Sequence, residues 1–364
     1  LHNFSPPYYC LYYLPNLGFC LPTNRDSFLI LLLKNNCNYS TYVKEELIML
    51  QHLEKKNVTM LPGLFRERML VNRNYLLELG TQELLQNYYL EAGIVMPDLQ
   101  VLERPETAKL HWGWEAPTCQ LRGHFLGHWL SAASSLIASE NDAALKAKLD
   151  EIISELARCQ ELNGGEWIGP FPEKYFTRLE KELDIWSPQY VMHKLIMGLT
   201  HAYLYAGNEQ ALTIVRHLSD WYILWTEKVQ STNPHAVYSG EESGMLEMWA
   251  QLFETTKDPV YETLASRYSN PSLFHNLSEG KDALTNCHTN SSIPWAHGAA
   301  RMYEVTGDEK YKTIVELFWK CAVTDRDYFC TGSANSGEFW VPPFLSGQYL
   351  NDRDQEFCTV YNMV

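Results

Sequence analysis

The sequence lacks several features that would indicate common classes of partner. It contains no run of basic residues and carries a formal net charge of −15, which argues against a nucleic-acid partner whose phosphates need neutralising. Its nine cysteines are irregularly spaced and include no Cys-x-x-Cys pair, so they do not indicate a disulfide framework. The apolar run at 28–33 is too short to span a bilayer, and no signal-peptide pattern is present. We therefore expect no nucleic acid and no membrane as partners, while the cellular compartment stays open.

Aromatic residues, by contrast, are abundant. They make up 13% of the chain and include 11 Trp and 22 Tyr. Sugar-binding clefts use such flat apolar faces with polar tips, although a large core also accounts for this composition. A length of 364 residues suits two average domains or one large helical or barrel domain. Because residues 1–45 differ in character from the rest, we expect an atypical N-terminal segment followed by one domain over 46–364.

The domain reads as a repeat of helical hairpins. Residues 143–160 place apolar side chains on one helical face and charged ones off it. Short turn motifs then recur around Gly207, Lys257 and Gly307, which are 50 residues apart, and each is followed by an Asp or Asn suited to cap the next helix. Units of this length predict stacked αα-hairpins, which either form an open solenoid or close into a toroid.

Polar and aromatic stretches alternate with these turns. They are residues 166–172, 184–194, 239–247 and 286–294. Each precedes or begins a helix at the end opposite the short turns. In a toroid they converge on one mouth, where a ligand pocket is expected.

Several residues near that mouth carry candidate chemistry. Glu338 is flanked by aromatic residues, which suits either a general acid of raised pKa or an ordinary loop glutamate. Glu356 and Cys358 form a Glu-x-Cys pattern whose oxygen and sulfur suit zinc, but zinc needs further ligands. His193 and His288 are ambiguous between core and functional roles.

His124 and His128 are a further pair of candidate ligands. They are four residues apart and share a helix face. They lack the Glu of a His-Glu-x-x-His motif, so they indicate a metal site only weakly.

The order of the motifs is more specific than any one of them. From about residue 55 to the end, ten spaced motifs resemble the catalytic domain of glycoside hydrolase family 127, the β-L-arabinofuranosidase-like proteins. These motifs are Arg122–Ser131, Asn163–Gly165, Trp186–Lys194, Glu242–Glu247, His288–Asn290, Ile293–Pro294, Thr306–Asp308, Thr331–Gly332, Gly337–Phe339 and Glu356–Met363. The resemblance implies an all-α fold, an (α/α)6 barrel, and a retaining glycosidase that acts on an arabinose-containing glycan. Such enzymes use a cysteine thiolate held at a zinc ion as nucleophile.

The resemblance also implies roles for individual residues. Glu338 matches the position of the general acid/base, and Glu356 and Cys358 match two of the four zinc ligands. His193 and His288 match residues that contact sugar hydroxyls. Glu247 and Trp186, from neighbouring motifs, are assigned to substrate binding with them.

One departure from the family pattern affects the expected activity. The family's adjacent Cys-Cys pair, which supplies the nucleophile and the last zinc ligand, does not occur here. The β-sandwich domains that follow the barrel do not occur either. We therefore expect a barrel incomplete at its C-terminus that is inactive alone, and the oligomeric state stays open.

Two alternatives remain at this stage. A lanthionine cyclase-like toroid enzyme would need a late Cys-His zinc pair, to which Cys287-His288 is the nearest match. A non-catalytic αα-solenoid would instead bind a protein partner along its concave strip.

Overall fold

The structure is a computed structural model that describes residues 53–95, 110–326, 335–349 and 356–364. The predicted boundary at residue 45 and the apolar run at 28–33 lie outside these residues, as does the Thr331-Gly332 motif. The chain divides into residues 1–52 and 53–364, and all that follows concerns the second unit.

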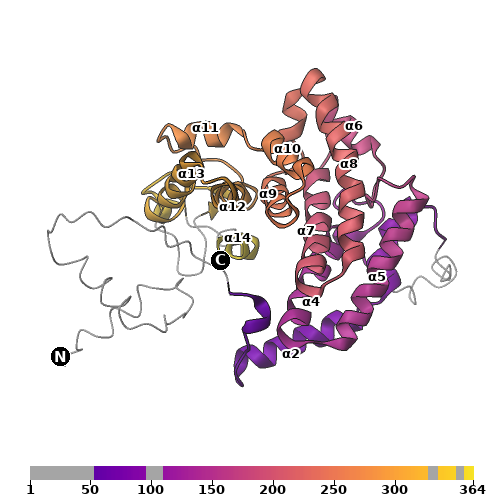
Figure 1. The fold of residues 1–364 in the computed structure, drawn as a ribbon. Coiled ribbons are helices and arrows are strands. Elements are labelled where there is room, and N and C mark those ends of the chain that lie inside the picture. Colours follow the sequence, from indigo (N-terminus) through magenta and orange to yellow (C-terminus); the bar gives the residue numbers. More distant parts are fainter. Residues whose placement is uncertain (1–52, 96–109, 327–334, 350–355) are drawn as a thin grey trace, which may run out of the picture. The chain divides into compact units, whose positions relative to one another are not determined.

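Helices dominate this unit (Figure 1). The longer ones are α2 (Leu64–Glu78), α3 (Thr81–Glu91), α4 (His124–Glu140), α5 (Ala143–Leu162), α7 (Pro188–Ala206), α8 (Glu209–Thr232), α9 (Met245–Thr256), α10 (Pro259–Tyr268), α12 (Thr289–Thr306) and α13 (Glu309–Trp319). Shorter helices are α6 (Lys174–Glu180), α11 (Ser272–Ser278) and α14 (Phe357–Met363), and a small hairpin pairs β1 (Asn335–Ser336) with β2 (Phe339–Trp340). The predicted all-α class is confirmed.

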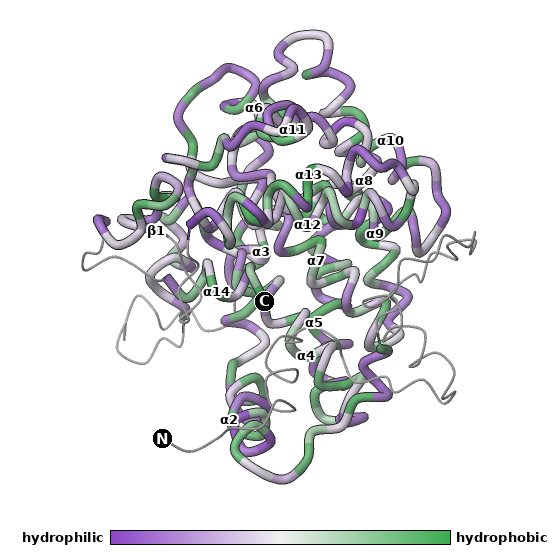
Figure 2. Tube along the Cα trace, turned by 90° about the vertical axis from the view of Figure 1, so that its left-hand side faces the viewer, coloured by the Kyte–Doolittle hydropathy of each residue, from purple (hydrophilic) through white to green (hydrophobic). Residues whose placement is uncertain are grey.

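The helices form two packed layers. Helices α4, α7, α9 and α12 contact one another in that order, and each is followed by an antiparallel partner, α5, α8, α10 or α13. The partners α5, α8 and α10 also contact one another in order. Figure 2 shows hydrophobic and hydrophilic residues alternating along these helices, as expected where one face packs and the other meets water. The structure therefore has the double-layered hairpin arrangement expected of an (α/α) barrel.

The short turns were predicted correctly from local sequence. Helices α4, α7, α9 and α12 all end at a residue in the left-handed conformation, which closes a helix with little strain when it is glycine. The next residue then caps the following helix, its side-chain oxygen accepting from a first-turn amide. These caps are Asp142, Asn208, Asp258 and Asp308.

The core contains the predicted apolar stripe of α5, whose members are fully buried: Leu145, Leu149, Ile152, Ile153 and Leu156. The tightest packing lies between α4 and α7. A Cβ added to Gly127 would lie 2.0 Å from the Lys194 carbonyl oxygen, and one added to Gly198 would lie 2.6 Å from the Gly127 carbonyl oxygen. The two backbones therefore touch, as small residues at a crossing permit.

The predicted separation of the two rims is confirmed. His193 and Glu247 lie near the starts of α7 and α9, and His288 is the residue before α12. Glu338 joins them, because its carbonyl oxygen accepts from the Thr289 amide at 2.9 Å. The short turns lie at the other ends of the same helices.

Candidate active site

Glu338 lies at the tip of the β1–β2 hairpin. Gly337 and Glu338 form its two-residue turn, with φ of 57° and 76°. Positive φ at both positions is typical of a type I′ turn, which is easy for glycine and costly for glutamate. The same conformation occurs at other non-glycine residues, such as the helix caps Asn141 and Lys257, so here it describes the turn that projects Glu338.

Main-chain contacts fix this turn against the start of α12. His288 and Phe339 form an isolated antiparallel bridge, and their rings lie 6.0 Å apart. The Trp340 amide donates to the Cys287 carbonyl oxygen at 3.0 Å, and the Trp340 indole donates to the Ser292 hydroxyl at 2.8 Å. The hairpin thus brings the predicted acid beside the predicted sugar-binding histidine.

Glu356 and Cys358 approach the same place from α14. Burial raises the pKa of Glu356, the nearby Glu338 carboxylate raises it further, and His288 lowers it. One Glu356 oxygen, Oε2, accepts from the Asn335 side-chain nitrogen Nδ2 at 3.2 Å. Although Cys358 is exposed, partial burial of its thiol and the Glu356 carboxylate raise the pKa of that thiol. The predicted acid and the predicted ligand pair therefore belong to one electrostatically coupled group.

This group falls short of a complete metal site. The described residues contain no cluster of three or more His, Cys, Asp or Glu arranged to hold a metal ion. Glu356 and Cys358 supply an oxygen and a sulfur of the kinds zinc accepts, which is half of a tetrahedral set. The chemistry of these two donors fits zinc, but two donors do not complete a four-coordinate zinc site.

Side-chain contacts hold α14 over the starts of the inner helices. The Asn362 amide nitrogen donates to the Asn290 side-chain oxygen at 2.6 Å and to its carbonyl oxygen at 3.3 Å. The Tyr361 ring lies 6.4 Å from the His128 ring of α4. Helices α4, α12 and α14 thereby converge at the mouth.

Beneath α14 lies a small enclosed cavity of about 20 Å³. Its walls include His193, Lys194 and Tyr190 of α7, together with Asn290 and Asn362. The buried His193 Nε2 has no hydrogen-bond partner among the described residues. A Cβ on Gly244 would lie 2.3 Å from the His193 ring, so only glycine fits at that point of the Ser-Gly-Met motif. The cavity thus contains a ring nitrogen available to a ligand.

The other two predicted substrate contacts lie nearer the surface. Glu247 Oε2 lies 3.9 Å from His297 Nδ1. Burial lowers the pKa of Lys194 to about 8, and the Glu247 carboxylate partly opposes this shift. Trp186 is 45% exposed just before α7. Both lie near the starts of the inner helices, Glu247 in α9 and Trp186 just before α7.

Two buried charged groups at the mouth escaped the sequence-based assignments. Lys194 is 5% exposed and lies 5.0 Å from the centre of the Tyr190 ring. Glu242 is 4% exposed, and burial raises its pKa to about 7. Both stand inside motifs identified from the sequence. A lone charge in the apolar start of α7 was the available signal for Lys194, whereas Glu242 lies in a polar stretch before α9 that gave no such signal.

The His124–His128 pair has a structural explanation. Glu115 Oε1 lies 2.7 Å from His124 Nδ1, and the same carboxylate accepts from the Gly123 and Phe125 amides at the start of α4. Burial lowers the pKa of His128 to about 3, with Lys194 adding to the effect. His124 therefore belongs to a helix-capping cluster, in agreement with the weak metal interpretation.

Comparison with known proteins decides the family. Residues 57–364 match the model described as β-L-arabinofuranosidase, GH127 catalytic domain. The chain belongs to this family. The match favours neither the lanthionine cyclase-like nor the solenoid alternative. No curated protein matches the chain significantly.

Solved structures support the fold. The chain is similar to the crystal structure of Ara127N-Se, a GH127 β-L-arabinofuranosidase from Geobacillus stearothermophilus T6, with 16% identity and a TM-score of 0.57, covering 84% of this chain and 51% of that one. It is also similar to the GH127 β-arabinofuranosidase BT3674, with 15% identity and a TM-score of 0.60, covering 85% of this chain and 49% of that one. The chain spans about half the length of these proteins. None of the helices in the described ranges is both long and apolar enough to cross a membrane.

Proposed function

We propose that this GH127 domain serves a retaining glycosidase that hydrolyses β-L-arabinofuranosides in a carbohydrate substrate. The observation that carries the proposal is the convergence of Glu338, His288, Glu356 and Cys358 at one mouth of the helical layers. The family match supports the choice of sugar, as do the two structural relatives, which are a β-L-arabinofuranosidase and a β-arabinofuranosidase.

Glu338 is proposed as the general acid/base. A retaining mechanism needs one carboxyl group to protonate the leaving oxygen and then to accept a proton from the attacking water. The hairpin tip suits this role, because the backbone of Glu338 is fixed by the Thr289 amide while its side chain is exposed.

Glu356 and Cys358 are proposed as two ligands of a zinc ion. A bound zinc ion would lower the pKa of the thiol, countering the burial and the Glu356 charge that raise it. The remaining ligands are not assigned, because the described residues contain no third member of the set. The nucleophile is likewise assigned to no residue of this chain, since the implied Cys-Cys pair does not occur in it.

His193, His288, Glu247 and Trp186 are proposed to bind the substrate. The buried His193 Nε2 has no hydrogen-bond partner among the described residues, and a sugar hydroxyl would satisfy it. The half-exposed Trp186 offers a flat face to a sugar ring at the rim.

The test is a Glu338→Gln substitution in the full-length product of the gene that encodes this chain. General acid–base help is worth about 10²–10⁴-fold in rate, so kcat/KM on a β-L-arabinofuranoside with a poor leaving group should fall by about that factor. The loss on an aryl glycoside should be smaller, because its leaving group needs little protonation.

A matched control is Glu254→Gln, an exposed glutamate of α9 at the opposite rim, which should leave kcat/KM unchanged. Wild-type rates for Glu338→Gln on both substrates would remove the residue from catalysis. A product of inverted anomeric configuration, measured by NMR, would refute the retaining mechanism.

A further inference from the structure

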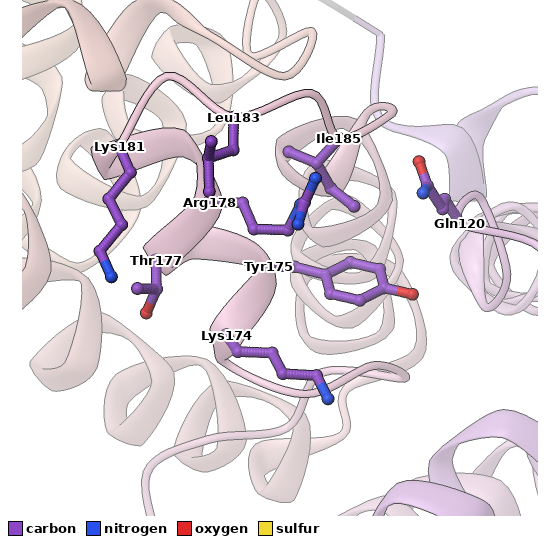
Figure 3. A pocket seen from close by; sticks show the side chains of 8 residues that line it. All are labelled: Gln120, Lys174, Tyr175, Thr177, Arg178, Lys181, Leu183 and Ile185. Carbon is purple, nitrogen blue, oxygen red and sulfur yellow. The ribbon is translucent and has the colours of Figure 1, made fainter.

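A second pocket opens beside the mouth and has no role in the proposed hydrolysis. It has a volume of about 590 Å³ and lies between α6, the segment that leads into α7, and the segment that leads into α4. Figure 3 shows Tyr175 and Gln120 facing each other across the opening, with Lys174 and Arg178 on either side of the Tyr175 ring and Lys181 farther away. The pocket therefore combines an aromatic face with positive charge.

The three cations lie on one face of α6 and its C-terminal end. Lys174, Arg178 and Lys181 are spaced i, i+4 and i+7, a spacing that aligns side chains on a helix. All three are exposed, and none forms an ion pair with a carboxylate among the described residues. Arg178 donates from Nε and Nη2 to the Asp184 carbonyl oxygen at 3.0 and 2.6 Å, which fixes its guanidinium at the pocket. Positive charge is thus concentrated here in a chain of net charge −15.

Three of the four acidic residues at 173–184 are engaged elsewhere. Glu173 accepts from the Trp221 indole at 2.9 Å, and Glu180 pairs with Lys228 at 2.7 Å, both on α8. Glu182 accepts from the Asn233 amide at 3.2 Å. The fold therefore turns these three acids toward α8 and its end. It leaves the bases around the pocket together with Asp184, whose carbonyl oxygen accepts from Arg178.

The aromatic wall is rigid. The Tyr175 ring stacks on Phe171, with 4.7 Å between centroids and 9° between planes. Its hydroxyl accepts from Arg122 Nη1 at 2.9 Å. Leu183 and Ile185 supply further apolar surface. The Arg122 guanidinium carbon also lies 5.3 Å from the centre of the Tyr175 ring. The part of the ring that Phe171 and Arg122 leave open, beside the apolar side chains, suits the flat face of a sugar ring.

The pocket is connected to the proposed active site. Gln120, which lines the pocket, accepts from the Trp186 amide at 2.7 Å. Trp186 leads directly into α7, which carries His193. Trp114, 61% exposed, lies with its ring 6.1 Å from His124 at the start of α4. One exposed tryptophan, Trp186, is thus bonded to the pocket wall, and another, Trp114, lies at the start of α4.

We propose that this pocket binds a carboxylate-bearing sugar, a uronic acid residue of the glycan whose arabinofuranoside enters the mouth. Tyr175 would stack on the sugar ring while Lys174, Arg178 and Lys181 receive its carboxylate. The site selects acidic glycans among arabinofuranoside-bearing ones. The link to the mouth rests on the proposed function, whereas binding in the pocket is measured without hydrolysis.

The experiment titrates the 364-residue chain with tetragalacturonate by calorimetry and compares its fully methyl-esterified form, which has the same rings without charge. The double substitution Lys174→Gln and Lys181→Gln removes two charges that form no hydrogen bond or ion pair within the described residues. Loss of two exposed ion pairs should weaken tetragalacturonate binding about tenfold. The methyl ester should bind the wild-type chain at least as weakly as tetragalacturonate binds the variant, because the variant keeps Arg178 whereas the ester has no carboxylate.

A matched control is the double substitution Lys310→Gln and Lys312→Gln on α13, which makes the same change in net charge away from the pocket and should leave binding unchanged. Circular dichroism checks that both double variants are folded. Equal binding of the acid and its ester, or an equal loss in both double variants, would overturn the proposal. Displacement of tetragalacturonate by inorganic phosphate at equal concentration would also overturn it, showing a simple anion site. Hydrolysis data bear on Glu338 alone, so the two proposals fail separately.

Discussion

Glu242 makes the stability of the domain depend on pH in a way that one substitution should remove. Its carboxyl group is buried before α9, and its Oε1 has no hydrogen-bond partner in the described structure. Burial raises its pKa from 4.5 to about 7, and contact with the Trp295 side chain offsets this only partly. At 1.36 kcal/mol for each unit of pKa, ionising Glu242 in the folded state costs about 3 kcal/mol.

The direction of the effect follows from proton linkage. Between about pH 4.5 and pH 7 the folded chain keeps a proton that the unfolded chain has released, so stability falls as pH rises and the loss is complete above pH 7. Glu242→Gln keeps the shape and is neutral at every pH. The unfolding free energy of the variant minus that of wild type should therefore increase across this window by about 3 kcal/mol and then level off.

Urea denaturation followed by circular dichroism, repeated across that pH window, measures this difference. Taking the difference cancels the opposite contribution of buried histidines such as His128 and His201, whose pKa values burial lowers to about 3 and about 4. Glu262→Gln, at an exposed position on α10, is the control, and its difference from wild type should stay constant. A difference for Glu242→Gln that is equally flat would refute the reasoning that burial governs this carboxyl group.

Three further predictions concern packing, capping and metal binding. Gly127→Ala should lower the melting temperature, because the new Cβ would lie 2.0 Å from a carbonyl oxygen of α7 and overpacking costs about 1–3 kcal/mol. An unchanged melting temperature would contradict the close crossing of α4 and α7. Asp308→Ala should lower the unfolding free energy by about 1 kcal/mol, because the helix cap is lost. Asp142→Ala should lower it more, because Asp142 also pairs with an arginine of α2, and equal losses would show that this pair contributes nothing to stability. Cys358→Ser should lower the zinc content of the full-length protein measured by mass spectrometry, while Cys119→Ser should not; equal zinc in both would remove Cys358 from the ligand set.

The hairpin repeat was predictable because its signals are local. A left-handed residue followed by a capping Asp or Asn is determined by neighbours in sequence, so the turns at 141, 207, 257 and 307 were recognised even where Lys257 replaces glycine. The stripe of α5 was likewise predictable from its periodicity. The rims followed from the same signals, because helices of alternating direction place all the longer connections at one end.

The electrostatics of the mouth were not predictable in this way. The pKa values of Lys194 and Glu242 depend on burial by helices distant in sequence. The basic pocket shows the same limit. The sequence displays Glu173, Glu180 and Glu182 among the lysines and arginine of α6, and only packing against α8 reveals which charges are paired.

The attachment of the β1–β2 hairpin has a consequence for how this enzyme family can diversify. Amide-to-carbonyl bonds join it to the start of α12, from Asn286 to Trp340, from Trp340 to Cys287 and from Thr289 to Glu338. Every amino acid except proline supplies these groups, so mutation of the surrounding side chains leaves the anchor in place. Loops around the mouth can therefore change their sugar preference over generations while the proposed acid, Glu338, keeps its position, so that specificity and reactivity can evolve separately.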